Sequence, residues 1–201
     1  MSANLLALIA VILLLTYFAI LVALHVRDTR HHPLRDAVSD YGVGPTAGRF
    51  RIAVIANSLG ILAMTGALAD ELGLLGFTHS DYVILLLIPI TRLALAFFPA
   101  GMDSTRTTWT GRIHLILAIL SFTFVYLSVA QLTTPLTSFT SDTVGLLLLT
   151  LRWLAAFGLA AVVITMLAPA LRPFFGLAER IYLATTNLWF LVVALFLTFH
   201  R

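Results

Sequence analysis

Two arginines lie inside long apolar stretches of this chain, where a charged side chain needs a chemical reason to persist. Arg92 and Arg152 each fall within a hydrophobic run long enough to cross a membrane. An arginine at bilayer depth costs at least about 2.5–3.5 kcal/mol, and its guanidinium recovers energy by binding carboxylate or phosphate oxygens. The acidic residues fall in loops or at helix ends, so the partners we expect are backbone carbonyls, water, an acid reaching inward, an exogenous anion, or the amides Asn57, Gln131 and Asn187. The pattern predicts either an internal hydrogen-bonded strut or a pocket for an anionic head group or a cofactor carboxylate.

Three other side chains have the chemistry of acid–base catalysis or metal binding. Asp103, His114 and Glu179 lie in or next to loops, and they form a catalytic group only if those loops converge. The alternative is structural, because Asp103 and Glu179 can also pair with Arg112 and Arg180 and so tie the loops together. Both interpretations predict that the loops meet on one surface.

A pair of histidines is the weakest of the chemical signals. His25 and His114 are predicted at the end of the first helix and the start of the fourth, near the same membrane face. Two imidazoles from different helices can ligate haem axially, which makes haem the one cofactor that the sequence suggests. The alternative is that each histidine is hydrogen-bonded to a neighbour. No other metal site is predicted, and cysteine is absent, which excludes disulfides and thiolate ligands.

The elements that must position these residues are membrane helices. The chain has 201 residues, of which 60% are hydrophobic and 10% charged, and its mean hydropathy is +1.02. A hydrocarbon core of about 30 Å needs roughly 20 apolar residues per helix, and backbone groups in lipid must be paired within each helix. We therefore predict one all-α transmembrane domain, residues 1–201, with spans at about 4–26, 52–69, 82–100, 113–133, 144–167 and 181–199. These bounds put Arg92 about ten residues from either end of its span.

Small residues indicate which spans are interior. Gly60 and Gly66 in the second span, and Ala156 and Gly158 in the fifth, permit close helix packing. We expect these two helices to be surrounded by the others.

The distribution of arginine predicts the orientation. All twelve basic residues are arginine, and nine of them fall in the first, third and fifth loops: Arg27, Arg30, Arg35, Arg49, Arg51, Arg106, Arg112, Arg172 and Arg180. Because positive loops stay inside, we expect these loops in the cytoplasm and both termini outside the plasma (inner) membrane. Short, separated basic segments favour membrane lipids as partners and no nucleic acid.

Three polar segments of these loops carry a family resemblance: HPLRDAVSDYGVG at 32–44, FPAGMDSTRTTWTGRIH at 98–114 and GLAER at 176–180. In this order they resemble the domain of unknown function 998 family, which are small bacterial and archaeal membrane proteins with about six helices. The resemblance implies a six-helix fold with a structured polar cap on the cytoplasmic side, and it implies no activity. The positions that match are Ser39, Asp40, Tyr41, Gly42, Pro99, Asp103, Thr110, Gly111, His114, Glu179 and Arg180.

The function that these patterns favour is non-catalytic. We expect the protein to bind an anionic lipid or lipid-like ligand, or to serve as an accessory subunit of a membrane complex or homo-oligomer. The ligand-binding candidates are Arg92, Arg152, Asn57, Gln131, Asn187, Arg112 and Arg180. The alternatives are an intramembrane lipid-modifying enzyme that uses Asp103, His114 and Glu179, and a haem-binding electron carrier.

Overall fold

A computed structural model describes residues 2–75, 78–100 and 108–199 of the chain. Within these residues the regular structure is entirely helical, and six helices are long and apolar enough to cross a membrane. They are α1 (Ala3–Arg27), α2 (Ala47–Leu75), α3 (His79–Phe97), α4 (Trp109–Thr137), α5 (Asp142–Leu167) and α6 (Phe175–Phe199). The predicted all-α, six-span class is confirmed.

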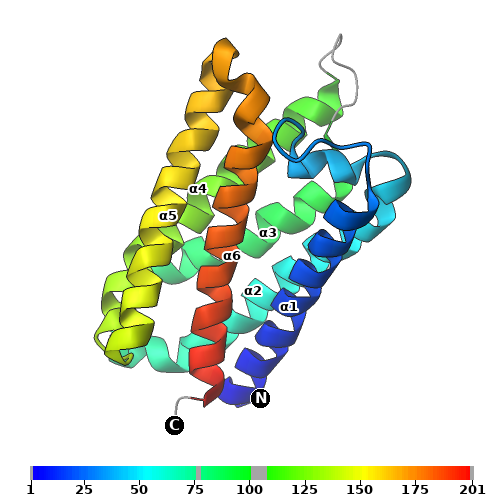
Figure 1. Ribbon diagram of the computed structural model, residues 1–201. Coiled ribbons are helices and arrows are strands. Elements are labelled where there is room, and N and C mark those ends of the chain that lie inside the picture. Colours follow the sequence, from blue (N-terminus) through cyan, green and yellow to red (C-terminus); the bar gives the residue numbers. More distant parts are fainter. Residues whose placement is uncertain (1, 76–77, 101–107, 200–201) are drawn as a thin grey trace.

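Helix α6 occupies the middle of the bundle (Figure 1). It packs against α1 on one side and α5 on the other, while α1 also packs along α2. The most apolar segments of α2 and α6 have 56% and 50% of their residues buried, against 22–28% for the other four helices. The prediction that the second span is interior is confirmed, but the same prediction for the fifth is wrong. Gly158 does permit a close approach, to the backbone of Tyr182 in α6, but most of the surface of α5 stays outside the bundle.

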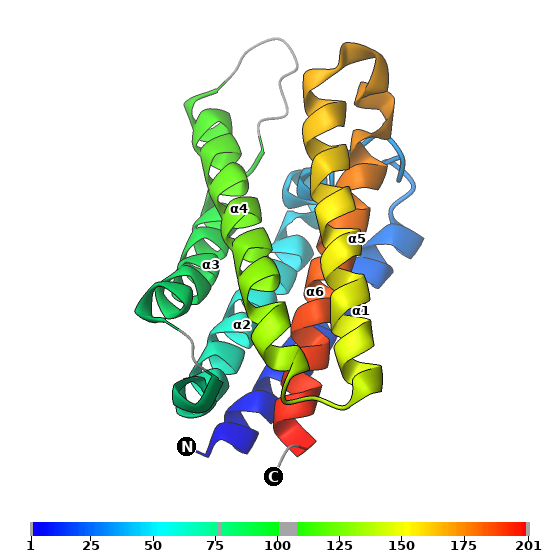
Figure 2. The same ribbon diagram turned by 90° about the vertical axis from the view of Figure 1, so that its left-hand side faces the viewer.

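The beginning of α1 and the end of α6 lie together at one end of the bundle (Figure 1). At the opposite end, which we call the arginine-rich end, lie the last turns of α1, α3 and α5 and the first turns of α2, α4 and α6. There α4 and α5 diverge from one another (Figure 2). This divergence separates two helices that are joined by a short turn at the other end.

Helix ends differ from the predicted spans where polar turns extend an apolar core. Helix α2 begins at Ala47 rather than at residue 52, and α6 begins at Phe175 rather than at residue 181. Helix α3 ends at Phe97 rather than at residue 100, because the residue before Pro99 is disfavoured in helical conformation. Arg92 is therefore five residues from the end of α3, which is about 7.5 Å along the axis rather than the predicted ten residues.

Side-chain caps fix where several helices begin. The hydroxyl of Thr108 accepts a hydrogen bond from the backbone N–H of Gly111 at 3.1 Å and caps α4. Thr78 and Ser141 cap α3 and α5 in the same way. Such caps satisfy backbone donors that have no partner within the helix.

The first connection folds back onto the bundle. It contains two short 3₁₀-helices, η1 (Val38–Gly42) and η2 (Gly44–Thr46). Val38 and Tyr41 of η1 are only 2% and 1% exposed, and they pack with Leu24 of α1. This segment is thus an ordered part of the arginine-rich end.

Candidate ligand-binding cavity

A cavity of about 390 Å³ lies toward the arginine-rich end, and residues from all six helices and from η1 line it. Its walls are mainly aliphatic and aromatic side chains of α4, α5 and α6. The volume falls within the roughly 300–1,000 Å³ typical of pockets that hold small organic ligands. The polar side chains in its lining are Tyr17, Ser39, Asn57, Arg92, His114, Ser121, Thr123 and Glu179.

The cavity reaches the membrane-facing surface between α4 and α5. Leu115 and Ile119 of α4 line it and are 50% and 49% exposed, and Val163 and Met166 of α5 line it and are 42% and 37% exposed. These residues lie on the two helices that diverge in Figure 2. Since lipid surrounds this face, the cavity communicates sideways with the bilayer.

Arg92 is the cation of this cavity, and two amides hold it. It is 6% exposed, and its Nη1 donates to Oδ1 of Asn57 and, at 3.2 Å, to Oδ1 of Asn187. Asn57 Nδ2 donates to the same Asn187 oxygen at 2.6 Å, and Asn187 Nδ2 donates to the Leu183 carbonyl at 2.6 Å. Helices α2, α3 and α6 are joined through this cluster, and its hydrogen bonds fix the guanidinium in place.

The second terminal nitrogen of Arg92 has no such partner. Nη2 is buried and makes no hydrogen bond within the described part of the chain. The ion pairs found among the described residues both belong to Asp28, so no carboxylate there pairs with Arg92. The amides supply dipoles but no negative charge, and the guanidinium is left without a counter-ion.

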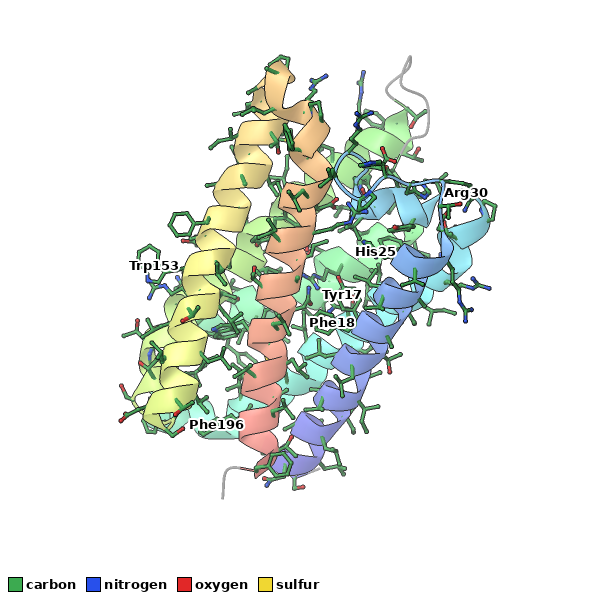
Figure 3. All side chains as sticks on the ribbon, viewed as in Figure 1. Tyr17, Phe18, His25, Arg30, Trp153 and Phe196 are labelled. Carbon is green, nitrogen blue, oxygen red and sulfur yellow. The ribbon has the colours of Figure 1, made fainter. Side chains whose placement is uncertain are left out.

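The other predicted ligand-binding residues lie elsewhere. Arg152 Nη1 donates to Thr134 Oγ1 at 3.3 Å, and its guanidinium lies 6.0 Å from the Trp153 ring, which points away from the bundle (Figure 3). Gln131 is exposed on α4, and Arg112 is exposed at the start of the same helix. Of the polar residues predicted inside the spans, the structure gathers Asn57, Arg92 and Asn187 and leaves out Arg152 and Gln131.

Glu179 is a buried carboxylate in the cavity wall at the arginine-rich end. It is 6% exposed, and its Oε2 accepts the backbone N–H of Val38 at 2.5 Å. Glu179 lies near the beginning of α6, as predicted, but α6 begins before the predicted span and this carboxylate is buried, which the sequence did not indicate. Glu179 thereby fixes the beginning of η1 against α6.

Arg180 and His25 strengthen the same attachment. Arg180 Nε donates to His25 Nε2 at 2.7 Å, and Arg180 Nη1 donates to the Asp36 carbonyl at 2.6 Å. His25 Nδ1 in turn donates to the Leu21 carbonyl at 2.7 Å, so both of its ring nitrogens are used. Figure 3 shows His25 at the end of α1 that carries this connection. These contacts make Arg180 a tie between α1, the first connection and α6.

Of the two remaining acid–base candidates, His114 lies at the cavity and Asp103 falls outside the part of the chain that the structure describes. His114 Nδ1 lies 2.7 Å from the Phe98 carbonyl, to which it donates. Among the described residues no group of three or more His, Cys, Asp and Glu is arranged to hold a metal ion. The haem ligation by His25 and His114 stays a prediction.

One residue of the site carries no sequence signal. Tyr17 is 5% exposed and lines the cavity from α1, but a single tyrosine in a 25-residue apolar helix is indistinguishable from a packing residue. Ser39, by contrast, belongs to one of the three polar segments and reaches the cavity through η1.

Charged groups outside the membrane-spanning helices organise the first connection. Arg30 donates to the carboxylate of Asp28 through Nε at 2.8 Å and Nη2 at 2.9 Å, and it holds the pKa of that carboxyl well below its usual range. His31 Nδ1 contacts the same carboxylate at 2.9 Å. Burial raises the pKa of Asp40, although its carboxylate accepts the Ala37 N–H at 2.8 Å.

Comparison with known proteins gives a family and no function. A comparison with curated proteins and another with solved structures found no match. A family model described as a protein of unknown function, DUF998, matches residues 9–196, which include the whole cavity lining and the ties around Glu179 and Arg180. The chain therefore belongs to the DUF998 family of membrane proteins.

Proposed function

We propose that this protein binds an amphiphile with an anionic head group, taken from the bilayer into the cavity beside Arg92. The supporting observation is the buried guanidinium whose Nη2 has no partner in the described chain. We further propose that the protein resides in the plasma (inner) membrane with the arginine-rich end in the cytoplasm, because loops rich in arginine stay on that side.

The energetics of Arg92 favour a ligand with a carboxylate or phosphate. A buried donor without an acceptor costs about 1–3 kcal/mol, and more when the group is charged. A ligand oxygen at Nη2 would supply both the missing acceptor and the missing negative charge, in a charge-assisted hydrogen bond. Asn57 and Asn187 hold Nη1 in place, so little further ordering of the side chain is needed on binding.

The walls of the cavity favour a ligand with an apolar tail. Leu159 and Val162 of α5 and Phe122 of α4 line it, and its mouth faces lipid between α4 and α5. A water-soluble anion would leave this apolar surface uncovered, whereas a fatty acid or a phospholipid would cover it with its chain. The chemistry shared by these ligands is one anionic head joined to a hydrocarbon chain.

Binding of a fluorescent polyene fatty acid and of its methyl ester to the purified protein in detergent tests the proposal. We expect Arg92→Gln to weaken binding of the acid by about 10- to 150-fold, which corresponds to one charge-assisted hydrogen bond of about 1.5–3 kcal/mol. The ester should bind both proteins alike. Arg152→Gln is the matched control, because Arg152 also lies within a span but outside the cavity lining.

Thermal unfolding separates binding from folding in this experiment. Equal affinity of the acid for wild type and a folded Arg92→Gln protein would overturn the proposal. So would equal losses for Arg92→Gln and Arg152→Gln, because a general effect of charge would then explain both.

A second candidate function is catalytic, and it is favoured by the presence of His114 and Glu179 in the lining of the same cavity as Arg92. In that case the bound lipid would be a substrate, with His114 and Glu179 as proton donor and acceptor. His114→Gln distinguishes the two functions when the protein is incubated with a lipid extract and the products are analysed by mass spectrometry. A binder keeps its ligand and forms no product in either protein, whereas an enzyme loses product formation on substitution. The roles as accessory subunit and homo-oligomer stay predictions.

A further inference from the structure

A second hollow of about 370 Å³ lies on the outside of the bundle, between α1 and α2 at the arginine-rich end. It shares no residue with the cavity beside Arg92. Ala19, Ile20, Ala23 and Leu24 line it from α1, and Ile52 lines it from α2. Two arginines, Arg27 and Arg49, complete its lining.

The apolar part of this groove faces the membrane. Ala19 and Ala23 are four residues apart and so share a face of α1, where their small side chains leave room beside Ile52. Ile52 is 58% exposed, and Val22 and Val26, which flank the groove on α1, are 60% and 76% exposed. A hydrocarbon chain is the occupant that such a surface meets in a bilayer.

The polar part of the groove carries two cations. Arg27 is the last residue of α1, Arg49 lies in the first turn of α2, and both are exposed. Neither side chain makes a hydrogen bond or an ion pair within the described residues, and no acid lines the groove. The neighbouring carboxylate of Asp28 is taken by Arg30 and His31. The two arginines are therefore free to bind one anion.

We infer that this groove is a binding site for an anionic phospholipid, with the phosphate head group between Arg27 and Arg49 and an acyl chain along Ala19 and Ala23. Charge complementarity selects this occupant over a second copy of the protein. A two-fold contact through the groove would bring the arginine pairs of both copies together, and their like charges would repel one another. The inference does not depend on the proposed function, since the two sites have separate linings.

Native mass spectrometry of the full-length protein in mild detergent tests the site, with dioleoyl-phosphatidylglycerol titrated against dioleoyl-phosphatidylcholine. Each arginine near an anionic head group raises the affinity for it by a factor of about five. The double variant Arg27→Gln/Arg49→Gln should therefore lower the preference for phosphatidylglycerol over phosphatidylcholine by about 25-fold at one site. The matched control is Arg35→Gln/Arg172→Gln. It removes the same charge from two exposed arginines at the same end of the bundle that line neither cavity.

A second variant tests the groove and leaves its charge unchanged. Ala23→Phe fills the apolar part from an exposed position on α1, where a larger side chain meets lipid rather than the core. We expect Ala23→Phe also to abolish binding of the one phosphatidylglycerol molecule that occupies the groove selectively. Retention of that lipid by Ala23→Phe or by Arg27→Gln/Arg49→Gln would overturn the inference. An equal loss in the control would do the same, because overall positive charge would then be the cause.

Discussion

Replacing Gly176 by alanine should detach the first connection from α6. A Cβ atom at this position would lie 2.3 Å from the Asp36 carbonyl oxygen, 2.8 Å from Arg180 Nη1 and 2.9 Å from the Arg35 carbonyl carbon. Two of these three atoms belong to the backbone of the segment that precedes η1, so no side-chain rotation relieves the clash. The segment must move away, and the hydrogen bond from Arg180 to Asp36 must lengthen or break.

The expected cost follows from three contributions. Over-packing costs about 1–3 kcal/mol, and loss of a hydrogen bond from a charged donor costs about 1.5–3 kcal/mol. Alanine is better than glycine within a helix by about 0.5–1 kcal/mol, which offsets part of the loss. The free energy of unfolding should therefore fall by roughly 1.5–5.5 kcal/mol.

Tryptophan fluorescence during denaturant unfolding in mixed micelles measures this change. Gly48→Ala is the control, because it is also a glycine in a helix but a Cβ there would meet nothing within 4 Å. We expect the control to be as stable as wild type or slightly more so. If Gly176→Ala were as stable as Gly48→Ala, the close approach of the first connection to α6 would be refuted.

Three further predictions concern Glu179, Asp28 and the orientation of the chain in the membrane. Glu179→Ala leaves the buried N–H of Val38 without its acceptor, so the free energy of local opening should fall by about 1–3 kcal/mol, measured as faster hydrogen exchange in residues 36–42. Glu179→Gln keeps an acceptor and should retain most of the protection. Equal exchange in the two variants would contradict the role of Glu179. Arg30 depresses the pKa of Asp28, so this carboxylate adds stability that is present above its ordinary pKa of 3.8 and is lost as the pH falls toward the folded-state pKa. The thermal midpoint of wild type should therefore approach that of Asp28→Asn below about pH 4. A constant difference down to pH 3 would refute the pairing. Reporter fusions at both termini should be active outside the cytoplasm and a reporter between α1 and α2 inside it, and the reverse pattern would invert the proposed orientation.

The helices were predictable because their apolar stretches exceed the length that a bilayer requires. Their rotations were not, since helices that are apolar on all sides give no sequence signal for the buried face. For this reason the sequence placed Arg92 and Arg152 in one candidate group, whereas the structure buries the former among amides and leaves the latter beside Trp153 near lipid. The sequence did indicate Asn57 and Asn187, because amides inside apolar spans are suitable partners for an arginine.

The cavity itself depends on features that no local pattern carries. It forms where α4 and α5 diverge, α4 packing mainly along α3 and α5 mainly along α6, and this choice of neighbours is a tertiary feature that neither helix carries in its own sequence. The interior position of α6 likewise had no glycine signal within the predicted span 181–199, since Gly176 lies before it. It is visible afterwards in the polar run Thr185, Thr186 and Asn187, all buried, which would be costly on a lipid-facing helix.

The most direct test of the account is to identify the lipids that remain bound after purification. Protein extracted in mild detergent, freed of loosely bound lipid and analysed by mass spectrometry, should retain one anionic amphiphile more in wild type and in Arg152→Gln than in Arg92→Gln, which keeps only the phospholipid of the groove between α1 and α2. If all three folded proteins carried the same lipids, or none at all, then Arg92 would be a structural residue and the cavity would not be a site for an anionic ligand.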